Sequence, residues 1–447
     1  MYEAIVIGGG PGGYVAAIRL SQLGKKVAIV EKEEFGGTCT NKGCIPTKAM
    51  LTASHLFTEI NEKAKKFGIL VDNVSYDLSL IMKHMQKSVT MSRKGIEFLM
   101  KKNKIEVFKD KAILKDKNTI LLEKSGQEIE GENIILAHGS VPVVFPPFDQ
   151  IEGIWTSDDV FKMEKMPESI LIIGGGVIGV EFATFFSSFG VDVTIVELAE
   201  HILPNEDSDV AEEVKKALKK NKVKIIEGEK VEGVEKKGEK YIAKVAGKEI
   251  EVEKVLLAVG RRPNISEDIK GLGIEIERGV KTDKRMRTNI DNIYAIGDIR
   301  GQIMLAHVAM YEGIVAAHNI AGEEMEMDYR AVPSIIFSNP EVASVGKREK
   351  EVDREKVNIY KFPVSANGRA RTMEERLGFA KVIEEKETGK VLGVTIVSAN
   401  ATDMIMEGVL GVKYEMVTEK IAEAIHPHPT LTETLLGAFE GNWAIHI

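Results

Sequence analysis

Residues 4–13 of the chain read AIVIGGGPGG, a short apolar run that breaks into glycines. The run is rich in β-branched residues and therefore predicts a buried strand. Three of the glycines have the spacing G-x-G-x-x-G: Gly8, Gly10 and Gly13. A helical pattern follows, and a second apolar run, VAIV at residues 27–30, ends at Glu31. This order of strand, glycine turn, helix and strand is typical of a βαβ unit that binds a dinucleotide.

The same order recurs in the middle of the chain. Residues 170–179 read ILIIGGGVIG, with the spaced glycines Gly174, Gly176 and Gly179. In each unit an acidic residue, Glu31 or Glu197, follows the middle glycine by 21 residues. The first glycine permits the tight turn, the second lets the backbone approach a pyrophosphate, and the third lets the helix pack on the strand. A lone fingerprint is weak, but two complete units with equal spacing predict two dinucleotide sites rather than a purely structural repeat.

The residue at the end of the second unit also predicts which dinucleotide binds there. A carboxylate at Glu197 accepts hydrogen bonds from a ribose 2′-hydroxyl but repels a 2′-phosphate. No arginine cluster lies near Glu197 in the sequence. We therefore expect NAD rather than NADP at the second site. Each unit is closed by a later apolar run that ends in glycine, at Gly139 and Gly260.

Length and composition restrict the class of protein. At roughly 150 residues per domain, 447 residues predict about three domains. The net charge of −8 argues against a nucleic-acid or anionic-membrane partner. Two cysteines are too few for a disulfide-stapled secreted scaffold. Because no targeting segment or membrane span is apparent, we expect a soluble, cytoplasmic protein.

The two cysteines, Cys39 and Cys44, lie in GGTCTNKGCIPTK at residues 36–48. In an ideal α-helix, residues five apart have Cα atoms roughly 8–9 Å apart, beyond the about 7 Å that a disulfide tolerates. A disulfide therefore needs a distorted turn, which Gly43 permits. The spacing leaves open an exchangeable pair or two buried thiols that never meet. The adjacent fingerprint favours redox function, and the pattern fits no common zinc site, so no metal is expected.

A histidine near the C-terminus is a candidate base. A dithiol must lose a proton before it attacks a disulfide, which calls for a base that titrates near neutral pH. His428 lies in HPHPT at residues 426–430, and Glu433 follows it at a distance that allows the carboxylate to fix the imidazole tautomer. On its own, however, such a His-Pro repeat is more often a rigid surface turn.

Over essentially its whole length, the chain resembles the pyridine nucleotide–disulfide oxidoreductase family. The motifs that carry the resemblance are the two fingerprints, the cysteine segment at 36–48, YAIGD at 294–298, and HPHPT with Glu433. The resemblance implies an α/β fold with two Rossmann-like dinucleotide-binding domains and a C-terminal α+β dimerisation domain. We expect these domains at the following residues: 1–143 with 266–330 for FAD, 144–265 for NAD, and 331–447 for dimerisation.

Within the family, the chain is similar to members that oxidise protein-bound dihydrolipoamide with NAD. This implies that Cys39 is the interchange thiol that exchanges with the lipoyl sulfurs and that Cys44 lies against the flavin as a charge-transfer thiolate. His428, oriented by Glu433, would act as acid–base residue from the other subunit of a homodimer. The expected partner is a lipoylated carrier protein of a 2-oxoacid dehydrogenase complex or of the glycine cleavage system. Because no lipoyl-like segment precedes Met1, we expect this carrier to be a separate protein.

The resemblance also assigns the cofactor sites. Glu31 would bind the adenosine ribose of FAD and Asp298 its ribityl chain, and Lys48 would lie beside the flavin and pair with Glu181 at the nicotinamide pocket. For His307, a structural role is equally open. The other expected cofactor-binding residues are Gly8, Gly10, Pro11, Gly13, Lys32, Thr38, Gly139, Ala306 and His307 for FAD, and Gly174, Gly176, Gly179, Glu197 and Gly260 for NAD.

The chain departs from the family pattern at two positions, and three alternatives to the expected activity remain. Thr47 stands where the family commonly has Ser, and His138 stands where it commonly has Thr. Glutathione-type reductases usually need basic residues for a 2′-phosphate, which Glu197 opposes. Mercuric reductases carry an additional C-terminal cysteine pair, which this sequence lacks. A binding subunit with structural cysteines would not need Cys39, Cys44, His428 and Glu433 together.

Overall fold

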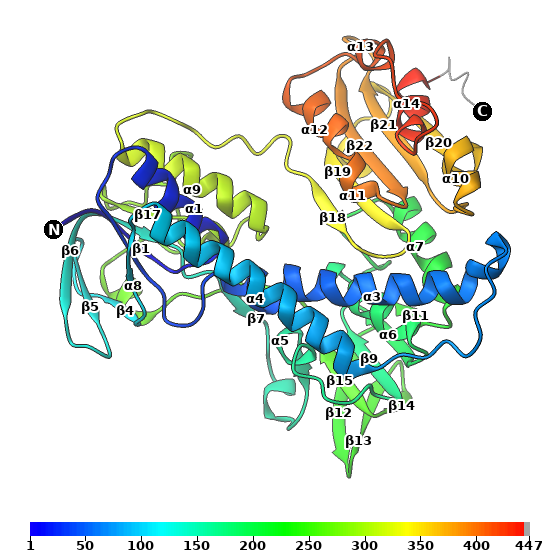
Figure 1. Ribbon diagram of the computed structural model, residues 1–447, viewed down its shortest axis with the longest axis horizontal. Coiled ribbons are helices and arrows are strands. Elements are labelled where there is room, and N and C mark those ends of the chain that lie inside the picture. The colour runs from blue at the N-terminus through cyan, green and yellow to red at the C-terminus, as the bar shows by residue number, and fades with distance from the viewer. Residues whose placement is uncertain (442–447) are drawn as a thin grey trace.

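The computed structural model describes residues 1–441, which form two α/β units and one α+β unit around a shared centre (Figure 1). The predicted fold class is confirmed, because each glycine fingerprint links a parallel strand to a helix. The last six residues of the expected dimerisation domain, 442–447, lie outside the described residues.

The first unit is built on a sheet in the order β3-β2-β1-β6-β5-β4, and β17 also pairs with β6. β1 (Tyr2–Ile7) lies parallel to and between β2 (Val27–Val30) and β6 (Glu128–Leu136). Because β17 (Ile293–Ala295) joins this sheet, the chain returns to the first unit after building the second. The other strands are β3 (Glu106–Phe108), β4 (Ala112–Leu114) and β5 (Thr119–Leu122).

The second unit repeats this plan with a parallel sheet in the order β11-β10-β9-β15-β8. Its buried strands are almost continuously apolar, as expected for a sheet that is covered on both faces. The strands are β8 (Trp155–Thr156), β9 (Ser169–Ile173), β10 (Asp192–Glu197), β11 (Lys224–Glu227) and β15 (Lys254–Leu257). An antiparallel sheet of β12 (Val231–Lys237), β13 (Lys240–Val245) and β14 (Lys248–Val252) is attached to this unit.

The third unit has an antiparallel sheet in the order β18-β19-β22-β21-β20, flanked by short helices. The strands are β18 (Ser334–Ile336), β19 (Glu341–Gly346), β20 (Val357–Pro363), β21 (Phe379–Glu385) and β22 (Val391–Ser398). The helices are α10 (Gly368–Thr372), α11 (Ala401–Met404), α12 (Met406–Lys413), α13 (Thr418–Ala422) and α14 (Glu433–Glu440). Alternating buried side chains on these strands form a core of their own.

Helices cover the sheets and connect the units. α1 (Pro11–Gln22) packs against α9 (Ala306–Ile320) in the first unit, and the long α3 and α4 run across the centre of Figure 1. The antiparallel pair β7 (Ser140–Pro142) and β16 (Arg261–Pro263) connects the first two units. The remaining helices of six residues or more are α2 (Gly37–Lys42), α3 (Cys44–Glu62), α4 (Leu78–Lys102), α6 (Val177–Ser188) and α7 (Ser208–Lys220), and the shorter ones include α5 (Ser157–Val160) and α8 (Glu267–Gly271).

A buried ion network holds the second unit to the third. Lys381 on β21 is 1% exposed, and its ammonium group donates to Asp207 at 2.8 Å, to Asp209 at 3.0 Å and to Glu349 at 2.6 Å. Burial lowers the pKa of Lys381, but hydrogen bonds to these carboxylates outweigh it and raise the pKa above its usual value. The network therefore holds a charged lysine in the buried contact between the second and third units.

Candidate active site

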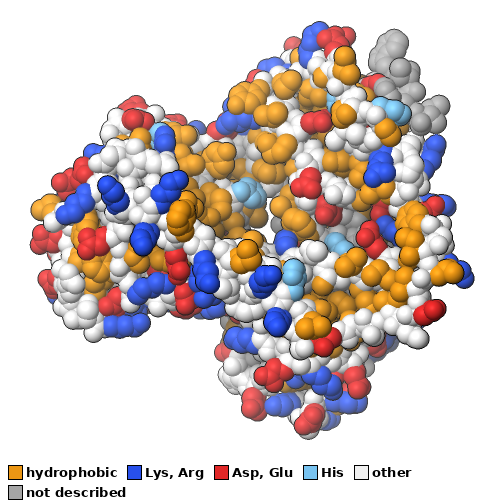
Figure 2. All heavy atoms as spheres, viewed as in Figure 1, with side chains coloured by type: hydrophobic (Ala, Val, Ile, Leu, Met, Phe, Trp, Pro, Cys, Tyr) orange, Lys and Arg blue, Asp and Glu red, His pale blue; other side chains and the backbone are white. Residues whose placement is uncertain are grey.

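A large cavity runs between the units, and both glycine fingerprints open into it. Its volume is about 1950 Å³, and it is lined by Gly8 and Gly10 from the first fingerprint and by Gly174 and Gly176 from the second. Figure 2 shows hydrophobic side chains gathered in the hollow between the lobes of the molecule. A cavity of this size accommodates more than one small ligand.

The third glycine of each fingerprint lies behind the cavity and allows close packing. A Cβ atom on Gly13 would lie 1.8 Å from the carbonyl oxygen of Gly8, and one on Gly179 would lie 2.0 Å from that of Gly174. Any larger side chain would push helix and strand apart. Gly13 and Gly179 therefore shape the turn, although neither is among the residues that line the cavity.

The acidic residue at the end of each second strand binds its own glycine loop. Glu31 accepts hydrogen bonds from the backbone N–H groups of Gly9 and Glu33, both at 2.7 Å. Glu197 does the same with Gly175 at 2.6 Å and Ala199 at 2.8 Å. Both carboxylates line the cavity, and each oxygen keeps a further lone pair for a ligand hydroxyl. The two units therefore share the hydrogen bonds of this carboxylate as well as the spacing of their glycines.

The two cysteines form a disulfide at the junction of α2 and α3. Their Cα atoms are 4.6 Å apart, far closer than in a continuous helix. The helix is interrupted at Gly43, where a Cβ atom would lie 3.0 Å from the carbonyl oxygen of Thr38. The predicted break at Gly43 is thus confirmed, and both cysteines line the cavity.

The loop that carries the disulfide is held by a side chain that the sequence analysis did not single out. The Asn41 amide donates to the carbonyl oxygens of Phe35 at 3.0 Å and Gly37 at 2.9 Å. Its own oxygen accepts from the Arg93 guanidinium at 2.9 Å. The backbone N–H of Gly36 also donates to Gly9 at 2.8 Å, which ties this loop to the first fingerprint.

An ion pair crosses the cavity from α3 to α6. The Lys48 ammonium group lies 2.9 Å from both carboxylate oxygens of Glu181 and 4.5 Å from the centre of the Phe337 ring. The side chain of Glu181 is 6% exposed, and it also accepts from the Phe337 N–H at 3.0 Å. The pairing of Lys48 with Glu181 therefore exists within one chain and joins all three units.

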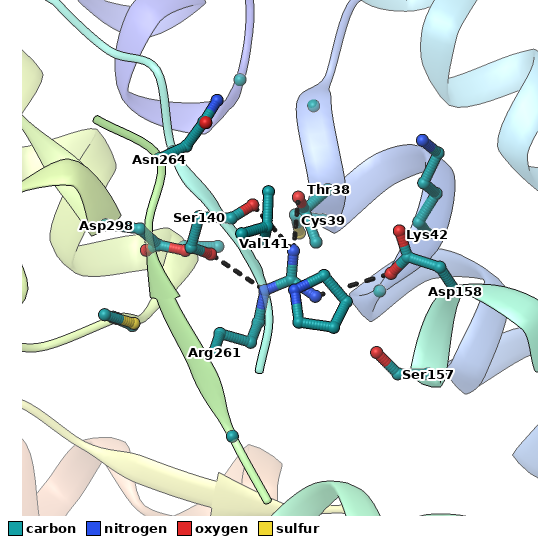
Figure 3. Close-up of a pocket in the computed structure, with 18 of the residues that line it drawn as sticks. Thr38, Cys39, Lys42, Ser140, Val141, Ser157, Asp158, Arg261, Asn264 and Asp298 are labelled. Atoms are coloured by element: carbon teal, nitrogen blue, oxygen red, sulfur yellow. Dashed lines mark hydrogen bonds and ion pairs between the residues drawn. The ribbon is translucent and has the colours of Figure 1, made fainter. Parts of the chain in front are cut away.

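The guanidinium group of Arg261 connects helix α2, which carries Cys39, with Ser140, the hydrogen-bond partner of Asp298 (Figure 3). Arg261 donates to the hydroxyl and carbonyl oxygens of Ser140 at 2.9 Å and to Thr38 Oγ1 at 3.3 Å, and it lies 3.5 Å from Asp158. The Ser140 hydroxyl donates to Asp298 at 2.5 Å. Burial raises the pKa of Asp298, although Ser140 and Arg261 act against it. Only the positions of Ser140 and Arg261, each directly after a strand-ending glycine, pointed to them in the sequence.

The expected acid–base pair lies apart from the cavity. His428 Nδ1 is 2.8 Å from Glu433, whose other carboxylate oxygen accepts from the Thr430 N–H at 2.8 Å. The His428 side chain is 77% exposed, and neither it nor Glu433 lines the cavity of the same chain. The carboxylate accepts the Nδ1 proton, so Nε2 is left as the acceptor of the neutral imidazole.

The other predicted site residues line the cavity, apart from the two packing glycines. His307 donates through Nε2 to the Pro333 carbonyl oxygen at 3.0 Å, and burial lowers its pKa. The remaining cavity-lining members of the predicted set are Pro11, Lys32, Thr38, Gly139, Gly260, Asp298 and Ala306. The structure therefore brings together the fingerprints, the cystine and the Lys48–Glu181 pair, and it separates His428 and Glu433 from them.

Comparison with known proteins identifies the family. Residues 2–313 match the model described as pyridine nucleotide-disulphide oxidoreductase, and residues 332–439 match the dimerisation domain of that family. The chain belongs to the pyridine nucleotide-disulphide oxidoreductase family. This family membership makes it a flavoprotein disulfide oxidoreductase and supports a homodimer.

Relatives and solved structures of this family match nearly the whole chain. It is 42% identical to a dihydrolipoyl dehydrogenase of Bacillus subtilis, over 98% of this chain and 96% of that one. A dihydrolipoyl dehydrogenase of Geobacillus stearothermophilus is 41% identical, with 98% and 95% covered. Among solved structures, the HOCl-induced flavoprotein disulfide reductase RclA of Escherichia coli is 28% identical with a TM-score of 0.89, covering 98% of this chain and 99% of that one. Within residues 1–441, no helix is long and apolar enough to cross a membrane.

Proposed function

We propose that this chain is an FAD-dependent enzyme that oxidises protein-bound dihydrolipoamide and transfers the electrons to NAD. The observation that carries the proposal is the Cys39–Cys44 disulfide, which lines the same cavity as both glycine fingerprints. The identity of about 41% to dihydrolipoyl dehydrogenases supports dihydrolipoamide as the substrate. In this proposal the dithiol is carried by a lipoylated protein, and we expect both proteins in the cytoplasm.

The residues at the two fingerprints fit the two cofactors. Gly8 and Gly174 have φ near +105°, and a Cβ atom there would collide with the backbone directly after the closing strand of its sheet. Behind them begin α1 and α6, whose free N–H groups attract a pyrophosphate. In our proposal, Glu31 and Asp298 hold the ribose and ribityl hydroxyls of FAD, and Glu197 holds the ribose of NAD. When bound, FAD and NAD supply the route by which two electrons leave the dithiol.

The protein's own residues carry out the thiol–disulfide exchange. One substrate thiolate attacks Cys39, which forms a mixed disulfide and leaves the Cys44 thiolate. The second substrate thiol, once deprotonated, attacks the sulfur bound to Cys39 and releases it. The products are a cyclic substrate disulfide and reduced Cys39 and Cys44, so two electrons pass from the substrate to the protein. Substrate protons must be removed for both attacks.

We assign proton removal to His428, acting from the partner copy of a homodimer. His428 is exposed and does not line the cavity of its own chain, whereas the third unit matches a dimerisation domain. Glu433 keeps the Nδ1 proton in place, so that Nε2 receives the substrate proton. Lys48 and Glu181 provide a fixed pair of charges in the region where we place the nicotinamide.

We further propose that the functional domains follow the boundaries expected from the motifs. Residues 1–143 and 266–330 would bind FAD, residues 144–265 would bind NAD, and the region from residue 331 would dimerise. This assignment is supported by β17 joining the first sheet and by the β7–β16 pair between the first two units.

Steady-state turnover with purified enzyme tests the proposal. With dihydrolipoamide and NAD⁺, we expect NADH formation that is abolished by Cys44→Ser and by Cys39→Ser. NADP⁺ should be a poor acceptor, because Glu197 repels its 2′-phosphate. Activity with NADPH and glutathione disulfide that exceeds the activity with NAD and lipoamide would refute the proposal. The natural carrier is then identified by comparing lipoylated proteins of the 2-oxoacid dehydrogenase and glycine cleavage systems as substrates.

A further inference from the structure

Helix α4 presents a basic and partly apolar face to solvent. The helix has six basic residues and one acidic residue, Glu97, whereas the whole chain has a net charge of −8. At about 100° of rotation per residue, the exposed Leu80, Met91 and Phe98 lie on one side of the helix, opposite its buried residues. The same side carries five exposed lysines, and we call it the lysine face: Lys83, Lys87, Lys94, Lys101 and Lys102.

Helix stability does not account for these lysines. None of the five forms an ion pair with another described residue. Lys83 and Lys87 are four residues apart, where like charges repel each other across one turn of the helix. Only Lys101 and Lys102 lie in the last turn, where the helix dipole favours a cation. The lysine face therefore concentrates positive charge that the described part of the chain does not compensate.

The same helix borders the loop that carries the disulfide. The Arg93 guanidinium on α4 donates to Asn41, which lies between the two cysteines, and both residues line the cavity. Lys87 and Lys94 lie within about 9 Å of Arg93 along the helix axis. In Figure 2, Lys and Arg side chains follow the line that α4 takes in Figure 1, below the hollow between the lobes. A protein seated on the lysine face would therefore lie beside the disulfide.

We propose that the lysine face is the docking surface for the carrier protein and binds acidic residues around its dihydrolipoyl group. The inference rests on the proposed function, which supplies the carrier. A partner of opposite charge gains from lysines that have no ion pair, and the exposed Met91 and Phe98 add apolar contact among them. Exposed charges act mainly on the rate of association. The lysine face should therefore raise kcat/KM for the carrier and leave the exchange chemistry unchanged.

Two peptides that differ only in charge test this surface with the FAD-loaded enzyme and NAD⁺. Each carries a dihydrolipoyl-lysine, flanked by aspartates in one peptide and by asparagines in the other. At low salt we expect kcat/KM to be about tenfold higher for the aspartate peptide, and this preference should vanish at about 1 M salt. Combining Lys87→Gln with Lys94→Gln should lower kcat/KM for the aspartate peptide about fivefold, as for the loss of two exposed ion pairs. Turnover of free dihydrolipoamide should stay within twofold.

Lys244→Gln combined with Lys248→Gln is the matched control. Both lysines are exposed on the sheet of β12, β13 and β14, and neither has an ion pair with a described residue, so the control removes the same charge elsewhere. It should leave kcat/KM for the aspartate peptide within twofold.

Several results would overturn this inference alone. Equal kcat/KM for the two peptides with the unchanged protein would do so, as would equal losses in the α4 variant and the control. A monomeric α4 variant would assign the lysine face to a second copy of the chain. Lysine-dependent binding to vesicles of phosphatidylcholine and phosphatidylserine would assign it to a membrane surface. If the unchanged protein did not turn over free dihydrolipoamide, the proposed function would be overturned as well.

Discussion

Replacing Lys381 with methionine tests whether the buried ion network holds the second and third units together. Methionine keeps the unbranched apolar stem and removes only the charge. The carboxylates of Asp207, Asp209 and Glu349 would remain, with oxygen atoms that all lie within 4.8 Å of one another. The perturbation therefore removes the buried cation that the three carboxylates share, while Asp209 keeps its ion pair with Lys361 and Glu349 keeps its ion pair with Arg354.

The expected loss of stability can be worked out from these distances. At an effective dielectric constant of about 20, two unit charges 4.8 Å apart repel by about 3.5 kcal/mol. Removing one partner of a buried ion pair costs about 3–5 kcal/mol in general, which agrees with this value. We therefore expect Lys381→Met to lower the free energy of unfolding by about 3–5 kcal/mol at pH 7.

The loss should also depend on pH. In the unchanged protein, burial acts to raise the pKa of Asp209, but Lys381, with a smaller contribution from Lys361, outweighs it and keeps the pKa below its usual value. That stabilisation is present above about pH 3.9 and is lost as the pH falls through the lower folded pKa. Without the Lys381 ammonium group the largest cause that lowers the pKa of Asp209 is lost, so the folded pKa of Asp209 rises. The difference between the variant and the unchanged protein should therefore shrink from pH 7 to pH 5.

Urea unfolding at fixed protein and FAD concentrations measures this difference, because bound ligand and oligomerisation also shift apparent stability. Lys361→Met is the matched control: Lys361 bonds to the same Asp209 at 3.1 Å, but its side chain is 45% exposed. An exposed pair contributes about 0–1 kcal/mol. If Lys381→Met cost no more than Lys361→Met at pH 7, or if its cost were the same at pH 5, the reasoning would be refuted.

Three further predictions concern the active site. Lys48→Met leaves Glu181 buried without its cation, so kcat with NAD should fall at least tenfold. Exchange of the disulfide with free thiols should continue, and an unchanged kcat would contradict this prediction. Glu433→Gln removes the negative charge that stabilises the protonated imidazole of His428 and leaves only an amide oxygen as acceptor of its Nδ1 proton. We expect kcat to fall about 10²-fold with a shifted pH–rate profile, whereas an unshifted profile would indicate a structural role. Glu197→Ser should lower the KM for NADP⁺ relative to the KM for NAD⁺, and steady-state kinetics measures both values. If the ratio of the two KM values were unaltered, Glu197 would not determine the selectivity for NAD over NADP.

Much of the fold followed from local patterns. A helix after each glycine fingerprint was predicted from spaced glycines and apolar runs, which act within a few residues of each other, and the structure has these helices at Pro11–Gln22 and Val177–Ser188. The break at Gly43 was predicted because five residues of continuous helix cannot bring two sulfurs together. Resemblance to a family supplied what spacing could not, namely the pairing of Lys48 with Glu181.

Other parts of the site were hidden from the sequence. Arg261 reaches Thr38 and Ser140, which are 223 and 121 residues away in the chain. The hydrogen bonds of Asn41 to its own loop are local, but its contact with Arg93 spans 52 residues. In the sequence, Arg261 is marked only by its position directly after Gly260, and Asn41 only by its position between the two cysteines. Neither position indicates the distant residues that these side chains contact.

By itself, the sequence determined two βαβ units, two acidic residues at the ends of their second strands, and a cysteine pair that needs a break in its helix. These features depend on spacing within about 20 residues, where backbone geometry limits the possible structures. Only the tertiary structure decided that both fingerprints and the cystine share one cavity, that His428 lies outside it, and that Lys381 is buried among three carboxylates. Those outcomes depend on packing and desolvation between distant segments, which no local pattern encodes.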